Sequence, residues 1–505
     1  MAEDFDYIIV GGGSAGCVLG ARLSEQRHVR VLLLESGARS TRPELSLPVA
    51  WPTLQGTEVD YAYNTVPQPG TNDSVHAWPR GHTLGGSSSI NAMVFLRGHR
   101  NDFDQWARAG CSGWDYESVL PYFCRTESVV GGESGFRGMS GPMHPAIAQQ
   151  PNPISELLIE AATAAGYPTT TDFNGSVQEG AGWHDLSITG GRRQSAADAY
   201  LDPVSETRPN LVVSTSSRAR RLLFDSGRCV GVEFMRGAEL VRAHASAEVI
   251  LSAGAVDSPR LLLLSGVGPA DELRRARVDV VHDLPGVGGN LHDHPLCSVV
   301  YESALRVPGG VANHSETSML WRSDPALPGP DMQMMFIHAP YHPPWLEAPD
   351  NSFTFAIATV PESRGTLRII SPDPSAPPLI DPNYLGTESD RRRLAHGIEV
   401  ARSLAATRPF APWRAREVLP GDEIRDDAGL RRYVARGTST YFHPVGTCRM
   451  GSGRESVVAP DLRVHGLRGL RVVDASIMPT VVCVNTNAAT LMIAEKAADM
   501  IAGRA

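Results

Sequence analysis

The glycine-rich turn at residues 11–16, with the sequence GGGSAG, is the feature that most constrains the fold of this chain. The apolar run at residues 7–10 predicts a buried strand before the turn, and apolar residues at helical spacing over residues 18–23 predict a helix after it. In such a unit the first glycine allows the bend, the second lets the backbone approach a pyrophosphate, and the third packs the helix on the strand. The pattern predicts a Rossmann-like α/β domain in which a dinucleotide is held by Gly11, Gly13, Ser14, Ala15 and Gly16.

A second apolar run, at residues 29–34, ends at Glu35, about twenty residues beyond the glycines. An acidic side chain at this position accepts hydrogen bonds from the adenosine ribose, and no arginine immediately follows it to favour a 2′-phosphate. A GxGxxG pattern alone also occurs in ordinary tight turns, but the order of strand, turn, helix, strand and glutamate favours dinucleotide binding. These residues leave open whether the dinucleotide is FAD or NAD.

The composition is that of a large globular protein. Of its 505 residues, 42% are hydrophobic and 20% are charged, and the formal net charge of -9 argues against a nucleic-acid or anionic-membrane partner. No run reaches the ~18 apolar residues of a membrane span, and the first residues are acidic, unlike a signal peptide. Seven scattered cysteines without a CxxC pair predict reduced thiols and a cytoplasmic location. The oligomeric state is unknown at this stage.

The middle of the chain changes character after about residue 300. Residues 301–380 carry apolar runs broken by prolines, and the runs at residues 332–337 and 353–357 predict antiparallel strands. A helical pattern follows at about residues 390–406. The chain is therefore expected to build a second unit with a different kind of sheet.

Two long motifs resemble the signatures of the glucose-methanol-choline (GMC) flavin oxidoreductases. The first is the hydroxyl-rich segment PRGHTLGGSSSIN at residues 79–91, and the second is GAVDSPRLLLLSGVG at residues 254–268. Backbone amides in a segment like the first suit an anion or a ring system. Shorter blocks similar to the same family lie, in the family's order, at residues 114–123, 191–196, 285–291, 443–447 and 473–476. The resemblance covers roughly residues 5–502.

The resemblance implies the cofactor and the domain plan. GMC proteins use FAD, so the dinucleotide is expected to be FAD. The fold class is then α/β: a Rossmann-like FAD-binding domain with a discontinuous α+β substrate domain built on a largely antiparallel sheet. The expected limits are 1–300 for the FAD-binding domain, with parts of 38–80 and 150–200 on the substrate side, 301–440 for the substrate domain, and 441–505 for the return to the FAD-binding domain.

The same resemblance adds cofactor-binding residues: Gly85, Gly86, Ser87, Asn91, Ala92, Met93, Val94, Ala219, Asp474, Ala475, Asn485, Thr486 and Asn487. Three positions depart from the family. His82 stands where the signature prefers Lys, Arg or Asn, so a contact there is weakened or taken by Arg80. Ala219 stands where relatives often have valine near the adenine, and a backbone contact would survive this exchange. Ile90 stands where some relatives bond the flavin through a histidine, so noncovalent FAD is expected.

The resemblance assigns the chemistry to His443 and Asn485. His443 is expected to take the hydroxyl proton of a primary or secondary alcohol while hydride leaves for flavin N5, giving an aldehyde or ketone, with O2 or another acceptor taking the electrons. An imidazole suits this because its ordinary pKa is near 6.5. Asn485, a neutral amide, is expected to orient the substrate oxygen, and it could also cap the helix that apolar residues after it predict. A merely structural role is the alternative for His443.

Tyr441, Phe442 and Met93 are expected to line the substrate pocket, unless they are ordinary core. Their apolar character favours an uncharged aromatic or medium-chain alcohol over choline or a polyol. The triplet at residues 292–294 (HDH) could suggest a metal site, but no further cluster accompanies it, so a structural or flavin-adjacent role and no metal are expected. Three other functions stay open: a lyase on the same scaffold with structural FAD, an NAD-dependent dehydrogenase, and a non-enzymatic binding protein.

Overall fold

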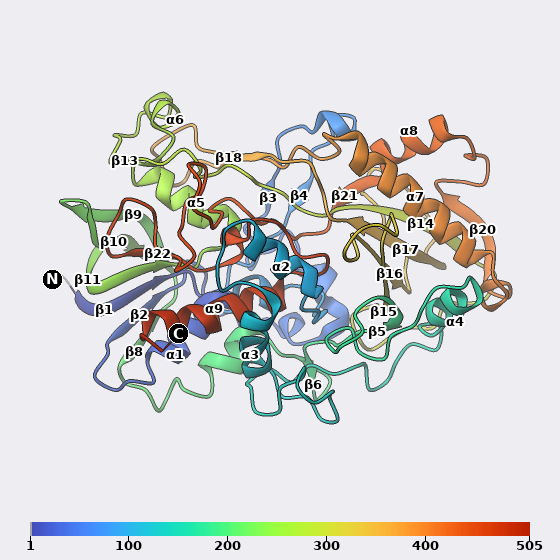
Figure 1. Ribbon diagram of the computed structural model, residues 1–505, viewed down its shortest axis with the longest axis horizontal. Coiled ribbons are helices and arrows are strands. Elements are labelled where there is room, and N and C mark those ends of the chain that lie inside the picture. The colour runs from blue at the N-terminus through green and yellow to red at the C-terminus, as the bar shows by residue number, and fades with distance from the viewer. Residues whose placement is uncertain (1–2, 505) are drawn as a thin grey trace.

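The computed structural model describes residues 3–504, which form two seven-stranded sheets joined at a central cavity. In Figure 1 the sheet with mainly parallel strands lies on the left and the antiparallel sheet lies on the right. Helix α9 (Asn487–Ile501) extends toward the region between them. The chain crosses between the two parts more than once. Residues far apart in the sequence therefore meet where the sheets adjoin.

The first sheet has the order β8-β2-β1-β11-β10-β9, with β22 beside β11. Its strands are β1 (Glu3–Val10), β2 (Val31–Leu34), β8 (Leu211–Ser214), β9 (Ser217–Asp225), β10 (Arg228–Arg236), β11 (Glu239–Leu251) and β22 (Leu470–Val472). Strands β8, β2, β1, β11 and β22 pair in parallel, whereas β10 and β9 are antiparallel. The register pairs Val10 with both Leu34 and Leu251, so the loops that follow these strands open at one edge. Ligands of open α/β sheets bind at this edge.

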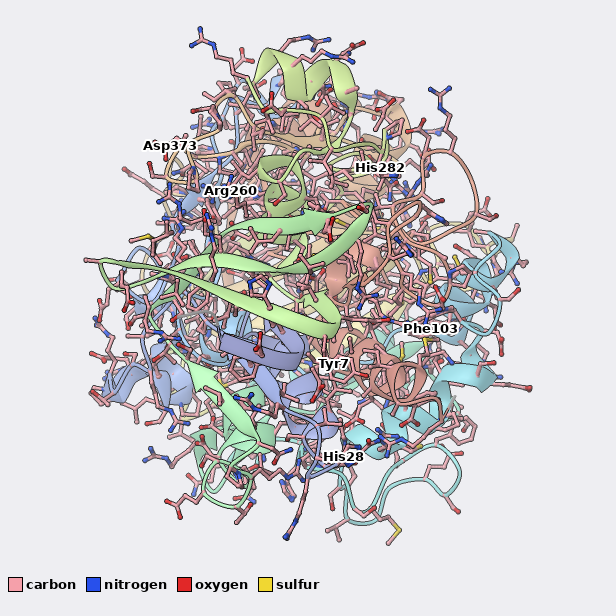
Figure 2. All side chains as sticks on the ribbon, turned by 90° about the vertical axis from the view of Figure 1, so that its left-hand side faces the viewer. Tyr7, His28, Phe103, Arg260, His282 and Asp373 are labelled. Carbon is pink, nitrogen blue, oxygen red and sulfur yellow. The ribbon has the colours of Figure 1, made fainter. Side chains whose placement is uncertain are left out.

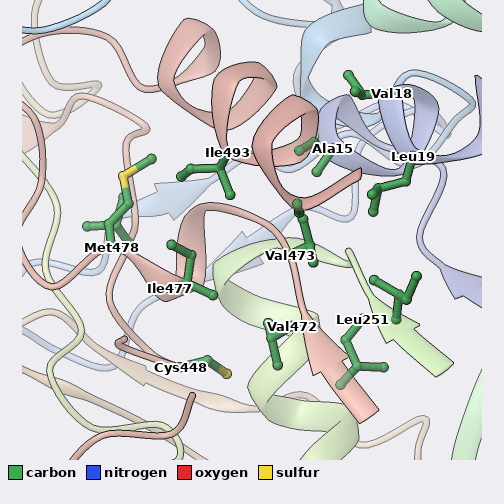
Figure 3. Close-up of a cluster of buried hydrophobic side chains, with 14 of the residues drawn as sticks. Ala15, Val18, Leu19, Leu251, Cys448, Val472, Val473, Ile477, Met478 and Ile493 are labelled. Carbon is green, nitrogen blue, oxygen red and sulfur yellow. The ribbon is translucent and has the colours of Figure 1, made fainter. Parts of the chain in front are cut away.

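Helices α1 (Ser14–Leu23) and α9 pack together over this sheet, and α3 (Tyr116–Thr126) packs against α9. Figure 3 shows Val18 and Leu19 of α1 and Ile493 of α9 in one apolar cluster with Leu251 and Val472 at the ends of β11 and β22. The remaining helices of this half are α2 (Arg100–Arg108), α5 (Gly254–Leu264) and α6 (Ala270–Arg275). Burial of the cluster fixes the first and last helices of the chain against each other.

The second sheet is antiparallel throughout, in the order β20-β14-β17-β16-β15-β5, with β21 beside β14. Its strands are β5 (Gly180–Trp183), β14 (Pro295–Ser303), β15 (Ser315–Trp321), β16 (Met332–Ile337), β17 (Ser352–Thr359), β20 (Arg414–Leu419) and β21 (Thr438–Thr440). Helices α4 (Leu157–Ala164), α7 (Glu388–Ala405) and α8 (Asp427–Gly437) share a core with it. Strand β17 is buried along its whole length, which shows that both faces of the sheet are covered.

Short two-stranded ladders complete the described part: β3 (Tyr63–Asn64) with β4 (Ala77–Trp78), β6 (Ile188–Thr189) with β7 (Arg192–Arg193), β12 (Val267–Gly268) with β13 (His282–Asp283), and β18 (Thr366–Arg368) with β19 (Leu379–Asp381).

The fold class expected from the sequence is confirmed, including the strands at residues 332–337 and 353–357 and the helix near residues 390–406. The domain limits stay a prediction. Residue 301 lies inside β14, and β5 comes from the expected 150–200 segment, so strands from before residue 300 contribute to the antiparallel sheet. Within residues 3–504, no helix is both long and apolar enough to cross a bilayer.

Candidate active site

A cavity of about 2110 Å³, part of it open to solvent, runs from the glycine turn at the edge of the first sheet to the wall formed by the second. Its lining runs from the glycine turn to the strands of the second sheet, so the dinucleotide site and a second wall share one cavity. Of the residues predicted for the site, all but two line this cavity. The exceptions are Gly16 and Gly85.

The glycine turn has the geometry of a pyrophosphate cradle. Gly11 has a φ of +106°, and a Cβ there would lie 2.5 Å from the backbone oxygen of Ser252. Around Gly13 the nearest atom to such a Cβ is 3.8 Å away, in Gly86, so a larger side chain would extend into the cavity. At Gly16 a Cβ would lie 1.9 Å from the oxygen of Gly11, which explains why this glycine serves packing instead of lining the cavity. These constraints fit a bound dinucleotide.

Glu35 joins the glycine turn to the end of β2. Its Oε2 accepts a hydrogen bond from the Gly12 backbone N–H at 2.9 Å, and its Oε1 accepts one from that of Gly37 at 2.7 Å. Burial raises the pKa of this carboxyl group to about 7, although these two hydrogen bonds oppose the rise. Because each carboxylate oxygen has two lone pairs, acceptor capacity is left for a ribose hydroxyl.

The second glycine segment touches the first. A Cβ on Gly86, whose φ is +54°, would lie 2.7 Å from the Cα of Gly13. The segment then continues along the cavity through Ser87, Ile90, Asn91, Ala92, Met93 and Val94. Asn91 is held by the buried Arg193, whose Nη1 donates to its Oδ1 at 2.8 Å. Gly85 lies behind this wall with a φ of +89°, so its role is to shape the turn.

The structure explains the departure from the family motif at His82. His82 lies outside the cavity lining, where its Nδ1 is 3.2 Å from the Glu58 carbonyl and its ring lies against that of Tyr61. Arg80 does line the cavity, and its Nη2 donates to the carbonyl oxygen of Phe442 at 2.6 Å. The cation at this wall therefore comes from Arg80.

The far end of the first sheet closes the opposite part of the cavity. Ala219 lines the wall here together with Arg218, Arg260 and Pro374. Figure 2 shows Arg260 near Asp373, and Nη2 of Arg260 donates to the carbonyl of Pro374 at 2.6 Å, which holds that loop over the sheet. Arg260 belongs to α5. At the start of this helix the Gly254 backbone N–H donates a hydrogen bond to Oδ2 of Asp474 at 2.9 Å, which connects α5 to the residues after β22.

The two predicted catalytic side chains meet. Nδ2 of Asn485 lies 3.2 Å from Nε2 of His443, and both residues line the cavity. The alternative interpretation of Asn485 as the cap of the last helix is wrong: the N-cap of α9 is Thr486, and no side chain caps this end. Thr486 and Asn487 line the cavity at the start of α9, so the positive end of the helix dipole faces the cavity and would stabilise an anion there.

His443 is held from three sides. Its backbone N–H donates to Oδ1 of Asp293 at 2.7 Å, its Nδ1 is 3.0 Å from Nδ1 of His294, and its Nε2 meets Asn485. Burial lowers its pKa well below the ordinary value, and His294 and Arg80 lower it further. The imidazole is therefore neutral at neutral pH and can accept a proton. Asp293 and His294 of the HDH triplet thus hold His443. Among residues 3–504 no cluster of three or more His, Cys, Asp or Glu side chains could hold a metal ion.

The second sheet contributes a wall that is mostly apolar. Tyr441, Phe442 and Met93 line the cavity as predicted, and sequence reasoning missed Trp51, Gln55, Leu296, Asn313, Ser315, Met335, Ile337 and Tyr341. The missed residues come from loops, a short 3-10 helix and three separate strands, so no local motif joins them. The three carboxylates that line the cavity, Glu35, Asp257 and Asp474, all belong to the dinucleotide half.

This combination of a dinucleotide cradle and a buried neutral imidazole defines a dinucleotide-dependent oxidoreductase. Comparison with known proteins gives the family. Models described as GMC oxidoreductase match residues 5–296 and residues 361–494. The chain belongs to the GMC oxidoreductase family, whose cofactor is FAD and whose members act on CH–OH groups.

Individual relatives resemble the chain over nearly its full length. The mitochondrial choline dehydrogenase of Mus musculus is 40% identical, covering 99% of this chain and 90% of the relative. The alcohol dehydrogenase [acceptor] of Pseudomonas putida is 39% identical, covering 98% and 95%. Among solved structures, the pyridoxine 4-oxidase from Mesorbium loti has a TM-score of 0.95 at 38% identity, covering 98% of both chains. A fungal aryl-alcohol oxidase has a TM-score of 0.87 at 25% identity, covering 99% of both chains.

Proposed function

We propose that this protein oxidises a neutral primary alcohol, carrying an aromatic or medium-length apolar group, to the aldehyde with noncovalently bound FAD. The observation that carries the proposal is the pair of His443 and Asn485 in the wall of a cavity that begins at the glycine turn. A substrate hydroxyl at this pair can accept a hydrogen bond from Nδ2 of Asn485 and donate one to Nε2 of His443.

His443 then takes the hydroxyl proton at Nε2 as the carbinol carbon loses its hydride. FAD, when bound, supplies the acceptor for that hydride. Because burial lowers the pKa of His443, the neutral ring that can accept a proton is the form present at neutral pH. Proton transfer to this ring becomes favourable as the substrate oxygen becomes a carbonyl oxygen. Asn485 keeps its hydrogen bond to this oxygen throughout, so it orients the substrate without exchanging a proton.

The sheet-side wall supports a neutral, ring-bearing substrate. Its aromatic side chains offer stacking surface, and the carboxylates of the cavity lie in the other half. A trimethylammonium group favours a carboxylate or a full aromatic cage, which argues against choline despite the choline dehydrogenases among the relatives. The buried Oγ of Ser315 has no hydrogen-bond partner among the described residues and can bind a polar atom on a ring. The names of the aryl-alcohol oxidase and the pyridoxine 4-oxidase agree with such a substrate.

Mixing the purified yellow protein with benzyl alcohol or hexanol without oxygen tests the function. We expect the flavin absorption to bleach, and to return when O2 or an artificial electron acceptor is added. A flavin that no alcohol bleaches would contradict the proposal and favour the lyase alternative. Comparing how fast the flavin absorption returns in air and with the artificial acceptor distinguishes an oxidase from a dehydrogenase.

A further inference from the structure

His294 and His443 face each other through their Nδ1 atoms at 3.0 Å, and their ring planes are 86° apart. Both rings are buried, with His294 only 1% exposed. At this distance one nitrogen carries a hydrogen and donates it to the lone pair of the other. The direction of this bond determines which nitrogen of His443 is free to receive a proton from a substrate.

The neighbours of His443 fix that direction. Oδ1 of Asn485 accepts a hydrogen bond from Nε2 of Gln333 at 3.3 Å, so its Nδ2 is the group that faces His443. Because an amide N–H only donates, Nε2 of His443 is the unprotonated nitrogen. Its Nδ1 therefore carries the hydrogen and donates to His294.

The far side of His294 agrees with this assignment. Its Nε2 is buried and has no hydrogen-bond partner among the described residues, and the backbone carbonyl of Val482 favours the protonated form of the ring. Because a carbonyl only accepts, this interaction favours a hydrogen on the nitrogen that does not face His443, which leaves the Nδ1 of His294 its lone pair. Burial lowers the pKa of His294 to about 3, so the ring does not gain a second proton that would reverse the bond.

We propose that His294 is a positioning residue: it accepts the Nδ1–H of His443 and so holds the catalytic ring in the tautomer whose Nε2 lone pair faces the substrate. The inference rests on the proposed role of His443 as the base. Its neighbour Asp293 has a separate task, because its bond goes to the backbone N–H of His443 and not to the ring. When Nε2 takes the proton, the bond from Nδ1–H becomes charge-assisted and strengthens, which also stabilises the transition state.

Two substitutions separate this role from simple packing. In His294→Asn, Oδ1 can take the place of the imidazole Nδ1 as acceptor, whereas His294→Leu fills a similar volume and accepts nothing. For the FAD-loaded proteins, the limiting rate of anaerobic flavin reduction by benzyl alcohol should fall about 10-fold to 100-fold in His294→Leu, the size expected for one lost hydrogen bond that strengthens with charge. His294→Asn should recover most of that loss. The dissociation constant for benzyl alcohol should stay the same, since His294 does not line the cavity.

Nitrogen NMR of the holoenzyme labelled with 15N-histidine gives a readout independent of activity. The Nε2 resonance of His443, assigned by its loss in His443→Ala, should have the shift of an unprotonated ring nitrogen. A protonated Nε2 in the wild-type protein would overturn the proposal, whether or not the Leu variant folds. Reduction of the folded His294→Leu holoenzyme at the wild-type rate would also overturn it. If instead His443→Ala is reduced at the wild-type rate, the proposed function of the base fails, and the tautomer measurement still stands on its own.

Discussion

The hydroxyl of Ser14 donates a 2.7 Å hydrogen bond to Oδ1 of Asn487, and these two residues are 473 positions apart in the chain. Ser14 begins α1 within the glycine turn, and Asn487 begins α9 two residues after Asn485. The bond therefore connects the dinucleotide cradle to the segment that carries the amide proposed to orient the substrate. With the apolar contacts between α1 and α9, it makes the position of Asn485 depend on the cofactor-binding turn.

Gly13→Val should abolish FAD binding, because a branched side chain at this position extends into the cavity where the pyrophosphate is expected. The purified variant should be colourless while remaining folded. Flavin absorbance per protein and circular dichroism measure the two properties. Gly309→Val is the matched control, since Gly309 is exposed, a Cβ there meets nothing within 4 Å, and the variant should stay yellow.

Denaturation by acid or heat should release all of the FAD into the supernatant. Ile90 lines the cavity at the position of the family's flavin-linking histidine and has no nucleophilic atom, and no cysteine of the described residues lines the cavity. Absorbance of the supernatant and of the washed precipitate gives the distribution. Yellow colour that stays with the precipitated protein would contradict a noncovalent cofactor.

The dinucleotide half was predictable from the sequence because its constraints are local. A strand, a turn that only glycine can form and a helix occupy consecutive residues, so Gly11, Gly13 and Glu35 could be assigned without a structure. The sheet-side wall was not predictable in this way. Trp51, Met335 and Tyr341 reach the cavity only through tertiary packing, and nothing in their local sequence distinguishes them from ordinary core.

The same limit explains what the sequence did not reveal around His443. The spacing of the HDH triplet indicates groups that can bind a metal or a proton, but it does not show where their rings point. In the structure Asp293 and His294 both contact His443, 150 and 149 residues further along the chain. The prediction that Asn485 pairs with His443 agrees with the structure. The alternative prediction that Asn485 caps the last helix is wrong, because that helix begins after Thr486. The cytoplasmic location expected from the cysteines stays a prediction.

His443→Ala should lower the limiting rate of flavin reduction by ~10²–10⁴-fold, the usual effect of removing an acid-base group, while FAD stays bound. Asn485→Ala should cost less, because the amide orients the oxygen without taking the proton. Anaerobic stopped-flow mixing with benzyl alcohol measures both. His28→Ala, at the exposed histidine labelled in Figure 2, is the control and should behave as wild type. An unchanged rate in His443→Ala would show that another group is the base.

Flavin reduction should be insensitive to pH between about pH 8 and about pH 6. The base must be unprotonated to act, and burial, aided by His294 and Arg80, lowers the pKa of His443 well below 6.5. The neutral form therefore persists as the pH falls, and the rate should decrease only below that range. A profile of the limiting rate against pH tests this. A decrease centred at pH 6.5 or higher would mean that the ring is more exposed to water than the structure shows.

Benzyl alcohol and hexanol should have higher kcat/KM values than choline and glucose. The wall beyond His443 carries Leu296, Met335, Ile337 and four aromatic rings, and none of the carboxylates that line the cavity. A quaternary ammonium group entering this wall would lose water without gaining a counter-charge, and a sugar would leave several hydroxyls without partners.

The buried hydroxyl of Ser315 provides one further test within the aromatic series. Ser315→Ala should lower kcat/KM for a pyridine methanol, which has a ring nitrogen to accept a hydrogen bond, and leave benzyl alcohol nearly unchanged. A preference for choline or glucose over both apolar alcohols would refute the proposed substrate class, because it would show that the mostly apolar wall does not select the substrate.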